Sequence, residues 1–374
     1  MENHILDDVF DGERALGGAF LQIDGPCGEG SFGEVFHAYD VHSRKEYAIK
    51  IVDLKDHKRA AKGELAILEY LKEEGAMKRN IGKLFTYTED MQSISFIMEF
   101  YEVNLVDYTN NMGLFKLPEA RVILSQLLDA LLHLRLLRVV HGDLKPNNVM
   151  LVDHAKKPLI IKLIDFGCSY HPEFSPWRKN ATYFQNKFYR APEVALGLPW
   201  SYPIDMWAFG CVAHDLVLGK LFQANTSFET MHMMVKAIGM PDQEMFQMGK
   251  KVKRFFLKED EKYRLKTVDE FNKDGNKHEE LVKRPALFDR LERFAIKLDG
   301  DRIENMDRRA YMAMIKELLI YDSADRPAAL TYRPKFLTME HLSRDRASQY
   351  FRDSRDKLKK CLTHIEIVGD STDV

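Results

Sequence analysis

The stretch HGDLKPNNVML, residues 141–151, places polar side chains inside an apolar part of the chain. The run RLLRVV precedes it and the run VML ends it. A buried strand or helix would carry valine or leucine where Asp143, Lys145, Asn147 and Asn148 stand. The stretch is therefore either a solvated loop or a catalytic loop. A carboxylate could orient a hydroxyl, an ammonium group could neutralise a phosphoryl group, and an amide oxygen could bind magnesium.

A second carboxylate follows an apolar strand a short distance downstream. In IIKLIDFGCS, residues 160–169, Asp165 stands directly before Phe166 and Gly167. The tripeptide is a weak signal by itself, because it also fits a turn at the end of a strand.

Upstream, Lys50 interrupts the apolar strand pattern EYAIKIV, residues 46–52. A lysine in a mostly buried strand costs free energy unless its charge is paired or its ammonium group reaches water at an edge. Glu64 is an available partner. It lies on the apolar face of the helical pattern KRAAKGELAILEYLKEEG, residues 58–75. A cation held by a helix carboxylate near phosphates would give both residues a role.

Three glycines, Gly28, Gly30 and Gly33, form a G-x-G-x-x-G pattern followed by Val35. Glycine lets backbone amides approach phosphate oxygens, but the pattern also occurs in plain hairpins and in dinucleotide sites. A dinucleotide site requires the third glycine to open a helix. Here EVFHAYDV, residues 34–41, has the pattern of a strand, which places the glycines in a hairpin turn.

The joint order of these motifs is far more specific than any one of them. After the glycines, Lys50, Glu64, H-x-D-x-K-x-x-N and D-F-G come A-P-E at 191–193 and D-M-W-x-x-G at 205–210. The sequence from about residue 20 to 340 resembles the eukaryotic protein kinases. The resemblance implies an α+β, bilobal protein kinase fold, with a small β-rich lobe carrying one main helix and a larger, mainly helical lobe.

The local patterns divide the chain in the same way. Short strand patterns and one helix fill residues 20–101, the expected small lobe, after an N-terminal extension at 1–19. Helical periodicity dominates the expected large lobe, 102–345, with the longest segments at 118–138, 203–219, 228–238 and 308–321. A charged, irregular insert is expected at about 241–285. Residues 346–374 are a polar tail with no strong pattern.

The resemblance implies a role for each matching residue. Asp143 orients the acceptor hydroxyl as catalytic base, Lys145 assists it, and Lys50, paired with Glu64, contacts the phosphates. Magnesium is held by Asn148 and Asp165. The implied ATP-binding residues are Gly28, Gly30, Gly33, Val35, Ala48, Lys50, Met98, Glu99, Tyr101 and Met150. Three further residues match structural positions of the family: Glu193 pairs with Arg326, and Asp205 holds the catalytic loop.

ATYFQNKFYRAPEVALGLPW, residues 181–200, resembles the dual-specificity tyrosine-regulated branch of the CMGC kinases. Residues 253–272 and 334–342 resemble the homeodomain-interacting protein kinases, whose catalytic loop reads His-Ala-Asp. Gly142 is a small residue at that same position, where most kinases carry arginine. An arginine there needs an anion, usually an activation-loop phosphate.

The resemblance implies an ATP- and Mg²⁺-dependent serine/threonine protein kinase that is proline-directed. Tyr183 aligns with the tyrosine that this branch autophosphorylates, and Arg190 is its expected partner and favours proline after the phosphoacceptor. Alternatively, Tyr183 is a packing aromatic. The rival function is a pseudokinase, a scaffold that binds nucleotide or partners without catalysis. Such proteins usually lose one of the key residues, whereas Lys50, Asp143, Asn148 and Asp165 are all present.

Composition restricts the setting. The formal net charge of −2 favours no direct nucleic-acid binding. The four cysteines are scattered without a C-x-x-C pair, which fits a reducing compartment. The most apolar window, 122–140, contains charged residues and indicates a buried helix, and the N-terminus lacks a signal-peptide pattern. We therefore expect a monomer that is intracellular, in the nucleus or the cytoplasm, without membrane partners. The basic run KKVKR, 250–254, is either a nuclear signal or a solvated face.

Overall fold

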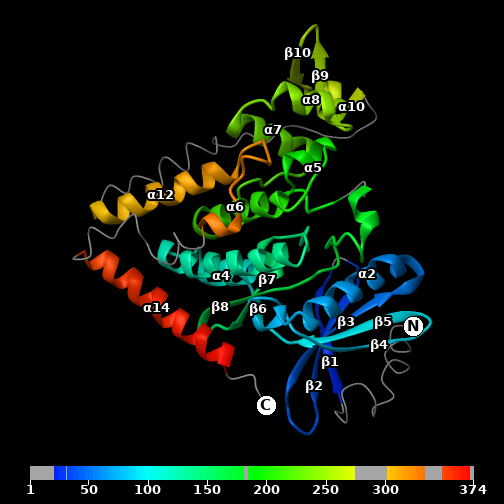
Figure 1. The fold of residues 1–374 in the computed structure, drawn as a ribbon, viewed down its shortest axis with the longest axis vertical. Coiled ribbons are helices and arrows are strands. Elements are labelled where there is room, and N and C mark those ends of the chain that lie inside the picture. Colours follow the sequence, from blue (N-terminus) through cyan, green and yellow to red (C-terminus); the bar gives the residue numbers. More distant parts are fainter. Residues whose placement is uncertain (1–20, 31, 181–183, 274–300, 333–347, 371–374) are drawn as a thin grey trace.

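Two lobes of different composition lie along the long axis of the molecule, a small one built on a β-sheet and a large one built of helices (Figure 1). The structure is a computed structural model and describes residues 21–30, 32–180, 184–273, 301–332 and 348–370. The protein is therefore α+β with two lobes.

The small lobe is an antiparallel sheet of five strands in the order β1-β2-β3-β5-β4. Its strands are β1 (Leu21–Glu29), β2 (Glu34–Asp40), β3 (Glu46–Asp53), β4 (Leu84–Glu89) and β5 (Ser93–Glu99). The sequence patterns predicted four of these. They missed the edge strand β4, in which only Leu84 is buried. An edge strand with one buried side chain has little of the alternation on which such a prediction depends.

Helix α2 (Leu54–Glu73) packs on this sheet and confirms the helix predicted at 58–75, although it begins four residues earlier. The Asp53 side chain accepts a hydrogen bond from the backbone N–H of Lys55 and so caps the helix start. Leu65, Leu68 and Leu71 are buried, so one face of α2 faces the core.

A three-stranded sheet in the order β6-β7-β8 lies between the lobes. It comprises β6 (Val103–Asn104), β7 (Val149–Asp153) and β8 (Lys157–Leu163). The polar stretch 141–148 leads directly into β7, and Asp165 comes two residues after the end of β8. Strands β7 and β8 pair antiparallel, which brings the two candidate carboxylate segments side by side.

The large lobe contains α3 (Leu105–Met112), α4 (Leu117–Leu136), α5 (Pro192–Leu196), α6 (Pro203–Leu218), α7 (Ser227–Ile238) and α12 (Arg302–Leu318). These helices confirm the four segments predicted from periodicity. Helices α4 and α6 are buried over most of their length and form the centre of the lobe (Figure 1).

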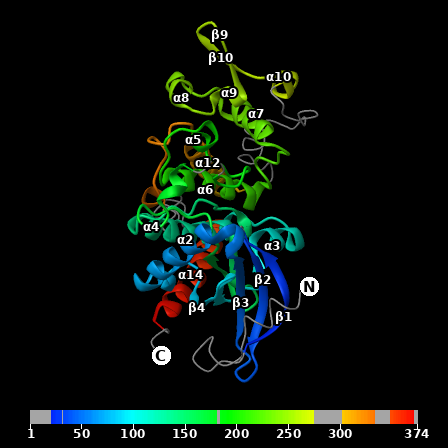
Figure 2. The same ribbon diagram turned by 90° about the vertical axis from the view of Figure 1, so that its right-hand side faces the viewer.

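The insert lies at the end of the molecule opposite the small lobe (Figure 2). Its described part contains α8 (Gln243–Met248), α9 (Val252–Phe255), β9 (Phe256–Glu259), β10 (Lys262–Leu265) and α10 (Val268–Lys273). The sequence indicated an irregular segment, but Phe246 stacks on Tyr263 and Phe256 is buried. Aromatic packing between short elements gives the insert regular structure that no single periodicity could reveal.

The tail also differs from the sequence expectation, because it forms the helix α14 (Gln349–Asp370) against α4 and β8. Phe351 and Leu358 are buried. Lys357 forms an ion pair with Glu119, and the Tyr350 hydroxyl donates to Asp307 at 2.8 Å. Asp307 in turn pairs with the buried Arg121 of α4. Docking against the lobe stabilises this helix, and such contacts leave no pattern in the local sequence.

Candidate active site

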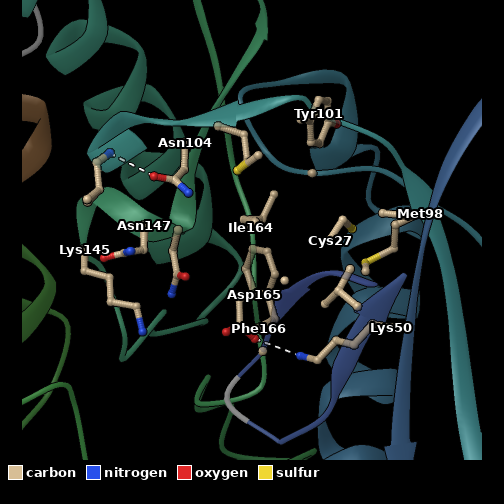
Figure 3. A pocket seen from close by; sticks show the side chains of 18 of the residues that line it. Cys27, Lys50, Met98, Tyr101, Asn104, Lys145, Asn147, Ile164, Asp165 and Phe166 are labelled. Carbon is tan, nitrogen blue, oxygen red and sulfur yellow. Dashed lines mark hydrogen bonds and ion pairs between the residues drawn. The ribbon is translucent and has the colours of Figure 1, made fainter. Parts of the chain in front are cut away.

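A cavity of about 740 Å³ opens between the two lobes, and residues from both lobes line it (Figure 3). Of the implied ATP-binding residues, those on its wall are Gly28, Gly30, Val35, Ala48, Lys50, Met98, Glu99, Tyr101 and Met150. The phenol of Tyr101 donates to the Glu99 carboxylate at 2.9 Å, which fixes the segment connecting the lobes. Mostly apolar walls with a few polar groups are typical of a nucleotide-sized ligand site.

Strands β1 and β2 pair as the predicted hairpin, but Gly28 lies inside β1 opposite Val35, and only Gly30 and Gly33 lie between the strands. The Gly30 N–H donates to the Gly33 carbonyl at 2.8 Å, and a Cβ at Gly30 would lie 3.0 Å from Lys50 Cε. Gly33 is not among the lining residues. A Cβ there would lie 2.0 Å from the backbone oxygen of Ile51, so Gly33 permits the close approach of β2 to β3.

Lys50 lies between two carboxylates from different parts of the chain. Its Nζ is 2.7 Å from Glu64 Oε1 on α2 and 2.8 Å from Asp165 Oδ1 (Figure 3). Lys50 and Glu64 are 3% and 2% exposed, so both charges are withdrawn from water. The structure thus brings together the lysine and the helix carboxylate that the sequence paired, and adds Asp165 as a third member.

This arrangement shifts the pKa values of its members. Burial alone would lower the pKa of Lys50, but Asp165 and Glu64 together outweigh it and raise that pKa above its ordinary value. Burial raises the pKa of Glu64, and the nearby Asp165 adds to the effect against the attraction of Lys50. The Arg178 guanidinium group adds a second positive charge near Glu64 and Asp165, so two cations face the two carboxylates.

Asp165 has a left-handed backbone with φ of 63°. This conformation is uncommon outside glycine, although aspartate tolerates it better than most residues. The ion pair with Lys50 and a hydrogen bond from the Gly167 N–H at 3.3 Å hold the carboxylate in place.

Asp143 is buried and is not among the lining residues, but its carboxylate accepts hydrogen bonds from three residues that line the cavity, Lys145, Asn148 and Asn186. Lys145 Nζ donates to Oδ2 at 2.6 Å and Asn148 Nδ2 to the same oxygen at 3.2 Å, while the Asn186 N–H donates to Oδ1 at 3.2 Å. Asn148 Nδ2 also donates to the Asp143 carbonyl. No sequence motif indicated Asn186. Its contribution comes from its backbone N–H and is therefore independent of its side chain.

Asp205 holds the loop that carries Asp143. Its carboxylate accepts the backbone N–H groups of His141 at 2.8 Å and Gly142 at 3.0 Å. Glu193 and Arg326 form the ion pair that the resemblance implied, with Nη1 2.8 Å from Oε1, and both are almost fully buried. These contacts lie behind the cavity and support it.

Arg190 lies outside the cavity wall. Its Nε donates to the Phe184 carbonyl at 2.9 Å and its Nη2 to the Gln185 carbonyl at 2.8 Å. Gln185 has a left-handed φ of 62°, another feature without a sequence signal. Tyr183, the expected autophosphorylation site, lies outside the described residues.

Behind the segment that connects the lobes, Lys162 of β8 donates to the carbonyls of Met77 at 3.1 Å and Arg79 at 2.6 Å. Burial lowers the pKa of Lys162 to about 8, with Lys83 adding to the effect and Glu99 opposing it.

We expect Lys162 to make stability rise with pH between about 8 and 10.5. In this window Lys162 is protonated in the unfolded chain and neutral in the folded chain. Its contribution to the free energy of unfolding is therefore fully present above the window and is lost as the pH falls through about 8. The difference in free energy of unfolding between the wild type and Lys162→Met should therefore change between about pH 7 and pH 9.5. Denaturant titrations measure it, and a difference that does not change with pH would contradict the shift.

The family model described as "Protein kinase domain" matches residues 21–334 of this chain. The chain therefore belongs to the protein kinase family. Within that family it is a CMGC branch member, with homologues named homeodomain-interacting protein kinases. Protein kinases generally use ATP with Mg²⁺. No helix in the described part of the chain is long and apolar enough to span a membrane.

Three relatives show the extent of the similarity. Homeodomain-interacting protein kinase 1 of Caenorhabditis elegans is 31% identical over 359 residues, covering 89% of this chain and 42% of that protein. The protein of the same name in Mus musculus is 34% identical over 334 residues, covering 84% and 27%. Serine/threonine-protein kinase ppk15 of Schizosaccharomyces pombe is 32% identical over 274 residues, covering 71% and 50%. The chain spans half or less of the length of these relatives.

Proposed function

We propose that this chain is a serine/threonine protein kinase that transfers the γ-phosphoryl group of ATP to protein hydroxyls, with a preference for a following proline. The observation that carries the proposal is the set of polar groups on facing walls of one cavity. Lys145 and Asn148, which both donate to the buried Asp143 carboxylate, lie on one side, and Lys50 with Glu64 and Asp165 lies on the other.

The donor set suits magnesium. Asp165 supplies carboxylate oxygens and Asn148 supplies an amide oxygen, both on the cavity wall, and oxygen ligands of this kind are those that Mg²⁺ prefers. Asn148 donates through Nδ2 to Asp143, which leaves its amide oxygen as the atom suited to the metal. When bound, Mg²⁺ would neutralise phosphate charge.

Lys50 is placed to bind the phosphates of ATP. Glu64 and Asp165 keep its ammonium group charged and fix its direction, so it would contact phosphate oxygens without first having to be ordered. The backbone of Gly28 and Gly30 lies on the same wall, where a Cβ at Gly30 would crowd Lys50.

Asp143 is placed to bind the acceptor hydroxyl of the protein substrate. Its carboxylate would accept the hydrogen bond of a substrate hydroxyl and so orient the oxygen for in-line attack. Lys145, 2.6 Å from that carboxylate, would neutralise charge on the transferred phosphoryl group. Phosphoryl transfer proceeds through a loose transition state, so position and electrostatic stabilisation provide most of the rate enhancement.

The contacts of Arg190 support the proline preference. The carbonyls of Phe184 and Gln185 both accept hydrogen bonds from its guanidinium group. A carbonyl oxygen that already accepts from a guanidinium group is a poorer acceptor for the backbone N–H of the residue after the phosphoacceptor. Burying an N–H without a partner costs free energy, whereas proline has no N–H to satisfy.

Replacing Arg190 with methionine is expected to reduce the ratio of kcat/KM for a Ser-Pro peptide over a Ser-Ala peptide by about fivefold, the value of one ordinary hydrogen bond. The substitution frees the Gln185 carbonyl to accept an N–H. Lys187→Met is the matched control, because Lys187 donates to the Asn225 carbonyl and its loss removes a nearby cation without freeing those carbonyls. An unchanged ratio in Arg190→Met would remove the structural support for proline selection.

We also propose that Tyr183 is autophosphorylated. The support is the match of residues 181–200 to the branch pattern, in which Arg190 is the expected partner of the phosphate. A Tyr183→Phe variant should lose the phosphotyrosine signal and part of the activity. Retention of both would contradict this part of the proposal.

The central experiment measures transfer of labelled phosphate from magnesium-ATP to Ser-Pro and Ser-Ala peptides and to the protein itself. The wild type should phosphorylate the Ser-Pro peptide, and Asp143→Ala and Asp165→Asn should not. Nucleotide binding without transfer in the wild type would instead favour a pseudokinase scaffold.

We further propose that the chain acts as a monomer on protein substrates, without direct nucleic-acid or membrane partners, in the nucleus or the cytoplasm. Support comes from the near-neutral net charge and from the four scattered cysteines, which form no C-x-x-C pair.

A further inference from the structure

Gly142, directly before Asp143, has a left-handed backbone with φ of 75°. A Cβ built on it would lie 2.6 Å from Phe184 Cζ and 2.7 Å from the Cys168 carbonyl oxygen. A side chain of any size is therefore excluded from this position by the ring of Phe184. The place that an arginine would occupy in most kinases is covered by an aromatic side chain.

Phe184 is itself held by a second ring. It stacks on Trp200 with a centroid separation of 4.3 Å and an interplanar angle of 16°, and the two side chains are buried. Tyr170 contacts Trp200 edge-on at 5.3 Å, and the Lys179 ammonium group lies 4.3 Å from the Trp200 ring centroid. Stacked and cation–π contacts of this kind add to the burial of the rings.

This cluster is connected to the catalytic carboxylate and its loop by three routes. The Asn186 N–H, two residues after Phe184, donates to Asp143 Oδ1 at 3.2 Å. Phe184 also packs over Gly142, which precedes Asp143. Tyr170 pairs its backbone with Val140, just before the loop. Movement of the Phe184 ring would therefore shift both the loop and the donor that aims the carboxylate.

We propose that Phe184 and Trp200 are positioning residues for phosphoryl transfer. Their stacked rings, seated on Gly142, fix the Asp143 carboxylate. This aromatic clamp, defined as Phe184, Trp200 and Gly142, takes the structural place of an arginine–phosphate contact. A phosphate on Tyr183 adds to the clamp and does not create it. The inference rests on the proposed kinase activity.

The clamp is tested with Phe184→Ala, which removes the ring, and Phe184→Leu, which restores part of its volume. Phe184→Ala should lower kcat for the Ser-Pro peptide by roughly 10- to 100-fold with little change in KM for ATP, since misplacing a reacting group by about 1 Å can cost 10²-fold. Phe184→Leu should recover most of the loss. Gly142→Ala, which displaces the ring by adding a Cβ, should lower kcat like Phe184→Ala.

Phe246→Ala is the matched control. In the insert, Phe246 stacks on Tyr263 with a centroid separation of 4.3 Å and an interplanar angle of 13°. The substitution therefore removes an equivalent ring that lies away from the cavity. Phe246→Ala should lower the melting temperature about as much as Phe184→Ala does, while kcat per folded molecule stays unchanged. Phosphatase-treated wild type should lose less activity than Phe184→Ala.

The outcomes separate the two proposals. An inactive wild type defeats the kinase proposal itself. An active wild type overturns the clamp if Phe184→Ala keeps its kcat. The clamp is equally overturned if Phe246→Ala loses as much kcat, or if phosphatase treatment abolishes activity.

Discussion

Asp143→Asn is expected to lower kcat for peptide phosphorylation by about 10²- to 10⁴-fold, the usual contribution of a positioned acid–base group, while nucleotide binding is retained. Asparagine keeps the shape of the side chain and an oxygen that can accept the Asn186 N–H. It loses the negative charge that orients the hydroxyl and that pairs with Lys145 at 2.6 Å. Steady-state kinetics with a Ser-Pro peptide, together with titration of an ATP analogue, separate the two effects.

Asp107→Asn is the control for this substitution. Asp107 lines the cavity and is exposed, and its carboxylate accepts a hydrogen bond from Asn104. Surface substitutions of this kind usually change free energies by no more than about 0.5 kcal/mol, so kcat should stay within roughly twofold of the wild type. If both variants lost the same activity, the loss would reflect the general charge of the cavity, and the role of Asp143 as base would be refuted.

Arg326→Met is expected to lower the free energy of unfolding by about 3–5 kcal/mol, because it leaves the Glu193 carboxylate buried without its partner. The two side chains are 0% and 3% exposed, and Arg326 also donates to the carbonyls of Pro203 and Ile320. Glu193 lies in the first turn of α5, three residues after Arg190, so the substitution should also loosen the segment that carries the Phe184 and Gln185 carbonyls. Denaturant unfolding measures the stability change.

The double variant Arg326→Met/Glu193→Leu tests the cause of that loss. If the unpaired charge is responsible, removing Glu193 as well should restore part of the stability, because a buried ion pair can be replaced by apolar residues at much lower cost than either charge alone. The recovery should be partial, since the Pro203 and Ile320 carbonyls still lack their donor. A double variant less stable than Arg326→Met would show that packing around the guanidinium, not the charge, dominates.

The sequence predicted the residues whose charges are buried, where an unpaired charge costs free energy. Lys50 in an apolar strand required a partner, and Glu64 on the apolar face of a helix required one too, so their pairing at 2.7 Å follows from burial and periodicity. Asp143 and Asp165 flank β7 and β8, and the antiparallel pairing of those strands explains why the two carboxylate segments meet.

What the sequence could not predict depends on backbone geometry and on long-range packing. The left-handed backbone of Gln185 and the N–H that Asn186 donates are main-chain features that side-chain identity does not reveal. The stack of Phe184 on Trp200 joins two ordinary aromatic residues. Helix α14 has few apolar positions in its described part, and it is held by its contacts with α4 and β8.

Helix α14 also has a consequence for how the chain is made. Its Lys357 pairs with Glu119 across 238 residues, and Asp307 pairs with Arg121 across 186. Synthesis proceeds at about 5–20 residues per second, so this face of α4 leaves the ribosome roughly 10–50 s before its last partner does. During that interval the nascent large lobe exposes apolar surface that α14 later covers, and chaperones that bind such surfaces would have their longest opportunity here.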